Sequence, residues 1–335
     1  MLRKLVTSQQ TGLVLVIVAA AVALIVFAGS HVDPRSGAEV NNFLNSHTLV
    51  QTATDASFFA VMAVGATIVI IAGGIDLSVG SIYAVAGVLS ALLLRHLNIN
   101  GGSAVLLGLG ASIGIGLLCG VANGVLVVGL RVHPFIVTLG TMWILRGIAF
   151  VASGAESVLV PSSLIAVAKA SLGFGSALYP VPMLVMLVVA VAGSAFLNFT
   201  VTGRRVFAVG GNEEASRFSG VPIGTIKIVV FLISGVTAGL AAFLGASFYG
   251  SASCADATGY ELYVIASAVV GGASLTGGKG SAVSGLLGAL LIVLIRQSIR
   301  TLHFDQNYEW IIIGCAIIVA VVLDQTSARL TRRTA

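Results

Sequence analysis

The chain has 335 residues, of which 57% are hydrophobic and 9% are charged, against about 25% charged residues in soluble domains. Its mean hydropathy of +1.07 suits a lipid solvent and leaves little room for a separate soluble domain. The net charge of +5 does not indicate a nucleic-acid partner, because no basic run exceeds two residues and basic residues commonly flank membrane spans.

Apolar runs of membrane-spanning length follow one another along the chain. They lie at about 11–29, 56–73, 79–95, 102–129, 134–153, 180–199, 226–248, 260–273, 281–299 and 308–324. The run at 260–273 is short for a crossing, and the glycine-rich stretch after it favours a half-helix packed inside the protein. The sequence therefore predicts an all-α integral membrane protein with about ten transmembrane helices, broken or half-helices included, in a single transmembrane domain over 1–335.

Basic residues fall unevenly on the two sides of the membrane when the N-terminus is placed in the cytoplasm. Eleven of the seventeen then lie inside, five lie outside and Arg146 lies within a span. Because positive charge concentrates in cytoplasmic loops, we predict a multi-pass protein with both termini cytoplasmic.

The stretch GGIDLSVG, Gly73 to Gly80, interrupts two apolar runs and places Asp76 at a break between helices. Asp76 and Ser78 are suited to satisfy the free backbone donors of the next helix. The alternative is that Asp76 contacts a solute or a partner.

Among the glycines of the fourth apolar run, several are four residues apart, which predicts a face where another helix backbone approaches closely. That helix belongs either to this chain or to a neighbouring subunit. The glycines include Gly108, Gly110, Gly114, Gly116, Gly120 and Gly124.

Arg146 lies within the fifth apolar run, close to Thr138 and Thr141. An arginine inside a membrane is costly unless it faces a polar cavity or a partner. The alternative is that its long side chain reaches the membrane surface.

The longest predicted cytoplasmic loop, 200–225, holds three basic and two acidic residues. Asn212 is suited to cap a short helix whose first turn is acidic, and Gly220 and Pro222 are suited to end it. A helix of about two turns is marginal alone in water, so we expect the membrane domain or a partner to hold it. The alternative is that the segment is a solvated connector.

Nucleotide binding and catalysis find no support in the motifs. In GGASLTGGKGS, Ala273 and Gly280 occupy two positions where a P-loop requires other residues. No H-E-x-x-H motif occurs, so no catalytic and no metal site is predicted. Ion-coupled secondary transporters often use carboxylates within the membrane, whereas most acids of this chain lie in loops or near span ends. Asp55 and Asp76 are the exceptions, and both lie near predicted boundaries, which weakens the alternative of a secondary transporter. A third possibility is a structural or sensory membrane protein that carries no solute.

Four motifs together are specific where each alone is weak. GGIDLSVG, PFIVTLGTMWILRG, GRRVFAVGGNEEASRFSGV and VVGGASLTGGKGS occur in an order and spacing that resemble the ribose-type (monosaccharide) permease family of bacterial ABC importers, within the branched-chain amino acid/sugar permease superfamily. The resemblance extends from about residue 40 to 325, and it implies a fold like that of type II ABC importers.

The resemblance also implies an activity and a set of partners. The chain would translocate a sugar or similar polar solute across the bacterial inner membrane, with no cofactor and no enzymatic activity of its own. ATP and Mg would bind a cytoplasmic ABC ATPase subunit. An extracytoplasmic solute-binding protein would deliver the solute, and a second permease copy, identical or a close paralogue, would complete the pathway.

The loop 200–225 resembles the coupling segment that sits in a cleft of the ATPase. The residues predicted to couple to the ATPase are Gly203, Arg204, Arg205, Gly210, Asn212, Glu213, Glu214, Ser216 and Gly220. The candidates for the translocation pathway are Asp76, Ser78, Asn123, Thr138, Thr141 and Arg146.

Overall fold

The computed structural model describes residues 9–32, 37–172, 179–316, 318, 319 and 322, and most of these residues are helical. Within this part of the chain, eight helices are long and apolar enough to cross a membrane. They are α2 (Gln9–Phe27), α3 (Ser46–Ile71), α4 (Val79–Leu97), α5 (Gly101–Leu130), α6 (Pro134–Ser153), α8 (Pro180–Phe199), α11 (Ile223–Tyr249) and α13 (Ala282–Thr301). All eight overlap predicted runs, which confirms the all-α membrane fold.

The remaining two predicted runs are different. Helix α12 (Tyr260–Val270) has 11 residues, or about 16 Å, which is too short for a hydrocarbon core of about 30 Å and agrees with the half-helix interpretation. In the run at 308–324, residues 308–316 are helical, whereas 317, 320, 321, 323 and 324 lie outside the described residues. The ends of the chain, 1–8 and 323–335, lie outside them as well.

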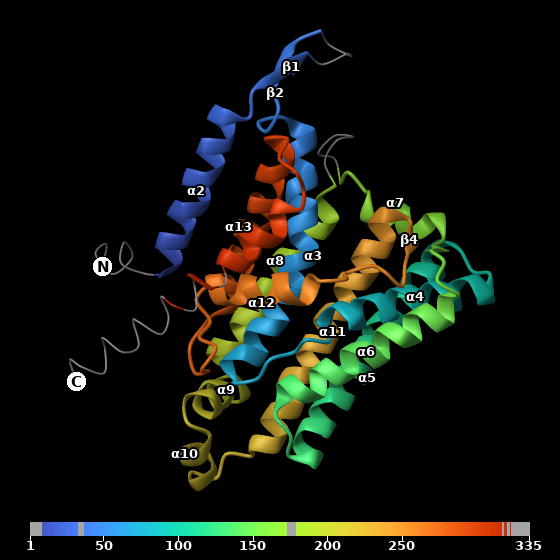
Figure 1. The fold of residues 1–335 in the computed structure, drawn as a ribbon. Coiled ribbons are helices and arrows are strands. Elements are labelled where there is room, and N and C mark those ends of the chain that lie inside the picture. Colours follow the sequence, from blue (N-terminus) through green and yellow to red (C-terminus); the bar gives the residue numbers. More distant parts are fainter. Residues whose placement is uncertain (1–8, 33–36, 173–178, 317, 320–321, 323–335) are drawn as a thin grey trace.

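Helix α3 forms the centre of the molecule (Figure 1). It packs against α8, α11, α12 and α13, while α4, α5 and α6 form a second group that joins it through α11. Helix α2 lies at the edge and packs on α13, where Leu24, Phe43 and Leu294 form a small separate apolar cluster. A central helix buried on all sides explains why α3 is almost uniformly apolar after residue 55.

The tightest helix pair is α5 against α11, and the predicted glycine face makes it possible. A β-carbon on Gly116 would lie 2.2 Å from the carbonyl oxygen of Gly235, and one on Gly120 would lie 2.3 Å from that of Phe231. Ser112 adds a hydrogen bond of 2.8 Å to the carbonyl of Gly239. Close packing of small residues therefore joins two helices of the same chain.

The two ends of the molecule carry different small elements (Figure 1). At one end lie the hairpin β1 (Ser30–Val32) and β2 (Glu39–Asn41), the pair β3 (Val158–Leu159) and β4 (Ser251–Ala252), and α7 (Ser162–Ala168). At the other end lie α9 (Val201–Gly211) and α10 (Glu213–Phe218). We call these the hairpin end and the α9–α10 end.

Helix α3 begins ten residues before the predicted apolar run at 56. Asn45 caps it by accepting a hydrogen bond of 2.8 Å from the backbone of Thr48. The first turns are polar, which lowers their hydropathy and hides them from a search for apolar runs. Asp55 is consequently the tenth residue of α3, about 14 Å from the helix start, so the predicted apolar run begins within a helix and not at its first residue.

Candidate functional site

Asp76 lies in the break between α3 and α4, where it is 1% exposed. One carboxylate oxygen accepts hydrogen bonds from the backbone and the hydroxyl of Ser78, at 2.9 and 2.6 Å. The other accepts a bond of 2.7 Å from Ser234 on α11. A buried carboxylate requires such partners, and here they hold the break of α3 and α4 against α11.

Three further predicted pathway residues adjoin this network. Asn123 on α5 donates to the hydroxyl of Ser78 at 2.7 Å, and Thr138 on α6 donates to the carbonyl of Ile75 at 3.1 Å. Thr141 lies one turn further along α6 and donates to the carbonyl of Thr138 at 3.3 Å. The structure thus brings Asp76, Ser78, Asn123 and Thr138 together, but in a buried position, and their contact with a solute stays a prediction.

Arg146 on α6 points away from the Asp76 network. Its guanidinium donates to the carbonyls of Cys254 and Asp256 at 2.7 and 2.6 Å, and to that of Ala257 at 3.3 Å. These carbonyls belong to the linker between α11 and α12, where Ala257 and Gly259 have positive φ. Arg146 therefore satisfies an irregular segment of backbone inside the protein, as such segments require at membrane depth.

The predicted coupling segment consists of two helices. Thr200 caps α9 by accepting from Gly203 at 2.9 Å, and Asn212 caps α10 by accepting from Ala215 at 2.9 Å. The prediction of a short helix after Asn212 is confirmed. Residues 201–211 before it form a second helix, which the sequence analysis did not predict. An apolar face, with Val206 and Val209 buried, holds α9 to the membrane helices.

Helix α10 is attached at one side and open on the other. Glu213 forms an ion pair of 2.9 Å with Lys227 at the start of α11 and one of 3.5 Å with Arg217, and Ser216 is buried. Glu214 is exposed, as is Phe218, at 84%. Glu214 and Phe218 therefore leave the outer face of α10 uncovered by the described part of the chain. Arg204, Arg205 and Gly220 are exposed as well.

Gly210 is the point where this segment contacts the core. A β-carbon there would lie 1.7 Å from the carbonyl oxygen of Ile71, at the end of α3, and 2.7 Å from the backbone nitrogen of Gly278. Gly278 itself donates to the carbonyl of Ile71 at 2.8 Å. We call this three-way contact the Gly210 junction; it joins α9, the end of α3 and the loop between α12 and α13.

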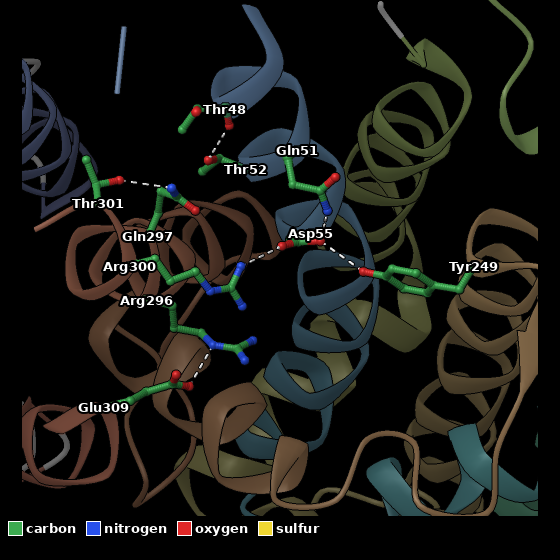
Figure 2. Close-up of polar contacts among 10 residues, drawn as sticks. All are labelled: Thr48, Gln51, Thr52, Asp55, Tyr249, Arg296, Gln297, Arg300, Thr301 and Glu309. Atoms are coloured by element: carbon green, nitrogen blue, oxygen red, sulfur yellow. Dashed lines mark hydrogen bonds and ion pairs between the residues drawn. The ribbon is translucent and has the colours of Figure 1, made fainter. Parts of the chain in front are cut away.

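A second polar site, which the sequence analysis did not identify, lies towards the hairpin end (Figure 2). We call it the Asp55 cluster. Asp55 on α3 accepts hydrogen bonds from Gln51 at 2.9 Å and from the hydroxyl of Tyr249 on α11 at 3.0 Å. Its other oxygen lies 3.4 Å from Arg300 on α13. Three separate helices thus meet at one carboxylate.

A second ion pair and several aromatic rings extend this site. Arg296 on α13 pairs with Glu309 at 2.6 Å, and its guanidinium lies over the rings of Phe59, Tyr260 and Tyr263 at 5.1 to 5.9 Å. Cation–π contacts of this kind stabilise a partly buried arginine. The site therefore combines balanced charges, hydroxyl and amide groups, and aromatic surface.

The sequence did contain a signal for the Asp55 cluster. Thr48, Gln51, Thr52 and Asp55 follow the i, i+3, i+4, i+7 spacing of one helix face. Figure 2 shows these side chains along one side of α3. The predicted apolar run begins only at 56, so the sequence analysis assigned no helix to residues 46–55.

No group of three or more histidine, cysteine, aspartate or glutamate side chains among the described residues is arranged to hold a metal ion. The polar groups of both sites instead bind one another and the backbone. Such groups are suited to positioning helices and to contacting a polar solute rather than to covalent chemistry.

Comparison with known proteins identifies the family. A family model described as the permease component of a branched-chain amino acid transport system matches residues 48–321. The ribose import permease protein of Escherichia coli is 36% identical over 284 residues, which cover 84% of this chain and 87% of the relative. The ribose import permease protein of Haemophilus influenzae is 38% identical over 286 residues, covering 85% of each chain.

A third relative, an L-arabinose ABC transporter permease protein of Azospirillum brasilense, is 33% identical over 287 residues, covering 85% of this chain and 82% of the relative. No solved structure matches this chain. The family match and these identities, together with the eight apolar helices, show a multi-pass membrane protein that belongs to the family of branched-chain amino acid transport system permease components.

Proposed function

We propose that this chain is the membrane-spanning subunit of an ATP-driven importer that carries a monosaccharide or similar polar solute across the bacterial cytoplasmic membrane. The observation that carries this proposal is the similarity to sugar permeases along 84 to 85% of the chain. Their names specify ribose and arabinose. The whole chain then acts as a single transmembrane domain.

The proposal assigns separate tasks to separate chains. A cytoplasmic ATPase subunit binds ATP and Mg and hydrolyses ATP, an extracytoplasmic binding protein delivers the solute, and a second permease copy completes the pathway. The α9–α10 end faces the cytoplasm, together with both termini, and the hairpin end faces the binding protein. The exposed Arg204, Arg205 and Arg217 at the α9–α10 end support this orientation, because cytoplasmic segments are enriched in basic residues.

Within this arrangement, α9 and α10 couple the ATPase to the membrane helices. Exposed Glu214 and Phe218 form the docking surface. The Gly210 junction then passes the movement of α9 to α3 and to the loop before α13. Its backbone contacts leave no gap, which favours transmission of a small displacement.

The test is transport by the reconstituted complex in liposomes. We expect wild-type uptake to require both ATP and the ATPase subunit. Replacing both acids, Glu213→Lys with Glu214→Lys, is expected to uncouple ATP hydrolysis from uptake. Glu213 also holds α10 to Lys227, so its replacement can unfold α10 as well as disturb docking. The single variant Glu214→Lys keeps that ion pair and tests docking alone.

The matched control is Glu156→Lys, which makes the same charge change at an exposed residue beside β3. Because this residue lies at the hairpin end, which faces the binding protein, the control is read without the binding protein, and it is expected to leave assembly with the ATPase subunit and basal ATP hydrolysis unchanged. Unchanged uptake in Glu214→Lys would remove the surface of α10 from the coupling mechanism. Uptake by this chain alone, driven only by an ion gradient, would establish the alternative of a secondary transporter.

A further inference from the structure

The Asp55 cluster gathers charged and polar groups where three apolar helices reach the hairpin end. Tyr249 is the last residue of α11 and Arg300 lies in the last turn of α13, and Tyr249 is 57% exposed while the side chain of Arg300 is 42% exposed. Charged groups at the end of a membrane helix face water or a partner, because contact with lipid is costly. This side of α3, α11 and α13 is therefore turned towards water or protein in the assembled transporter.

The chemistry of the cluster matches hydroxyl groups. The Asp55 carboxylate already accepts from one phenol, one amide and one guanidinium, at 2.9 to 3.4 Å. A sugar with neighbouring hydroxyls supplies the same kind of donor to a carboxylate and the same kind of acceptor to a guanidinium. The exposed donors Tyr249 and Arg300 lie at two different sides of Asp55 (Figure 2), so a solute can exchange with either.

Tyr249 also offers an apolar surface. One side of its ring packs near Phe58 and Phe248, with centroids 5.8 and 5.3 Å away, and more than half of the residue remains exposed. Amphipathic aromatic side chains can contact the apolar part of a ligand while the hydroxyl bonds its polar part. A monosaccharide presents both kinds of surface.

The charges of the cluster are balanced, which favours a neutral solute. Asp55 pairs with Arg300 and Glu309 pairs with Arg296, so a ligand with a net charge would leave one buried charge unmatched. A zwitterionic amino acid is the competing ligand, because its two ends match Asp55 and Arg300. Its own charges would compete with that ion pair, whereas a neutral sugar replaces hydrogen bonds and leaves the two charges balanced.

We propose that Asp55, Tyr249 and Arg300 form a contact site for the hydroxyl groups of a monosaccharide within the translocation pathway. The inference rests on the proposed function and assigns a substrate contact to that pathway. The three helices that supply these residues separate or approach as the transporter changes conformation, so the solute replaces protein–protein hydrogen bonds while it passes.

The experiment uses the full complex of permease, ATPase and binding protein in liposomes. The solute carried by the purified binding protein is first identified by mass spectrometry. Uptake of that sugar and of its monodeoxy analogues is then measured for the wild type and for Asp55→Asn, Tyr249→Phe and Arg300→Gln. For each sugar, uptake by the variant is divided by uptake by the wild type, measured with the same saturating amount of loaded binding protein. Differences in how the binding protein recognises the sugars therefore cancel in this ratio.

The expected result depends on the sugar. For the parent sugar, loss of a hydrogen bond to the carboxylate or from the guanidinium lowers uptake about tenfold or more, and Tyr249→Phe lowers it about fivefold. For the analogue that lacks the contacted hydroxyl, the variant and the wild type transport equally. An equal loss for every analogue, or no loss for any, would overturn the site.

Matched controls make the same substitutions elsewhere. Arg95→Gln alters an arginine in the last turn of α4, as Arg300 lies in the last turn of α13. Tyr308→Phe alters a tyrosine with a similar exposure, 52%. Both are expected to transport every analogue as the wild type does. A binding protein loaded with an amino acid, or a wild type that imports none of its sugar, would instead contradict the proposed function itself.

Discussion

Two aspartates associated with α3 have opposite surroundings. Asp76, just after the helix, is fully buried and binds the neutral groups of Ser78 and Ser234. Asp55, within the helix, keeps 13% of its side chain exposed and binds an arginine and a tyrosine from two other helices. Buried neutral partners fix a carboxylate in the folded protein, whereas partly exposed partners on separate helices allow exchange with solvent or solute.

The same contrast holds at the α9–α10 end. The Gly210 junction is built from backbone atoms in contact and leaves no room for a β-carbon. Helix α10 has only six residues and depends on its cap and its ion pairs. The molecule therefore combines rigid contacts that define the fold with weaker contacts suited to a partner or solute.

The largest effect is expected from Asp76→Ala. The substitution leaves the hydroxyls of Ser78 and Ser234 without their acceptor in a buried position and weakens the start of α4, at a cost of about 3 to 5 kcal/mol. We expect a large loss of protein that stays monodisperse in detergent during heating. Thermal stability equal to that of the wild type would show that the Asp76 network does not hold the break.

Gly210→Ala is expected to be the next most severe. The β-carbon of the new alanine would overlap the carbonyl of Ile71, so α9 must move away from α3, which destabilises the protein by about 2 to 3 kcal/mol. We expect ATP-driven uptake to fall by more than this loss of stability explains. The matched control is Gly211→Ala, one residue later, where a β-carbon meets nothing within 4 Å. Equal behaviour of the two variants in ATP-driven uptake would contradict the role of the Gly210 junction.

These expectations also show what the sequence could predict. Eight spans followed from hydropathy alone, because a lipid solvent demands about 20 consecutive apolar residues. The helix of α10 followed from Asn212 and the acids after it, because capping is local chemistry. The close α5–α11 contact followed from the glycine spacing, although the identity of the partner helix did not.

The features that the sequence did not predict depend on contacts between helices that are far apart in the chain. The burial of Asp76, Asn123 and Thr138 depends on α11 and α6, far away in sequence. The Asp55 cluster draws one residue or more from each of three helices, and its members on α11 and α13 carry no local signal. The spacing of polar residues in α3 is present in the sequence. A search for apolar runs does not detect it, because these polar residues lower the mean hydropathy of the first turns.

Asp55→Asn is expected to have a much smaller effect on stability than Asp76→Ala. Asparagine keeps the shape and one acceptor, and ion pairs that reach solvent contribute only about 1 kcal/mol. We expect a small decrease in thermal stability, measured in detergent with the same assay as for Asp76→Ala. A loss as large as that of Asp76→Ala would mean that the Asp55 cluster is also a rigid part of the fold.

The smallest effect is expected from Asn212→Ala. The substitution removes the acceptor for the backbone of Ala215, which costs about 1 kcal/mol, and the cost stays local because α10 packs only weakly on α11. Hydrogen exchange should therefore increase in residues 213–218 and not in α3. Asn198→Ala, the same change at an exposed asparagine bonded to the carbonyl of Ser194, is the control.

If the ATPase subunit binds α10, its addition must reduce the extra exchange in Asn212→Ala, because binding supplies the free energy that the cap no longer provides. Faster exchange that the ATPase subunit leaves unchanged would mean that α10 is held by its own chain alone.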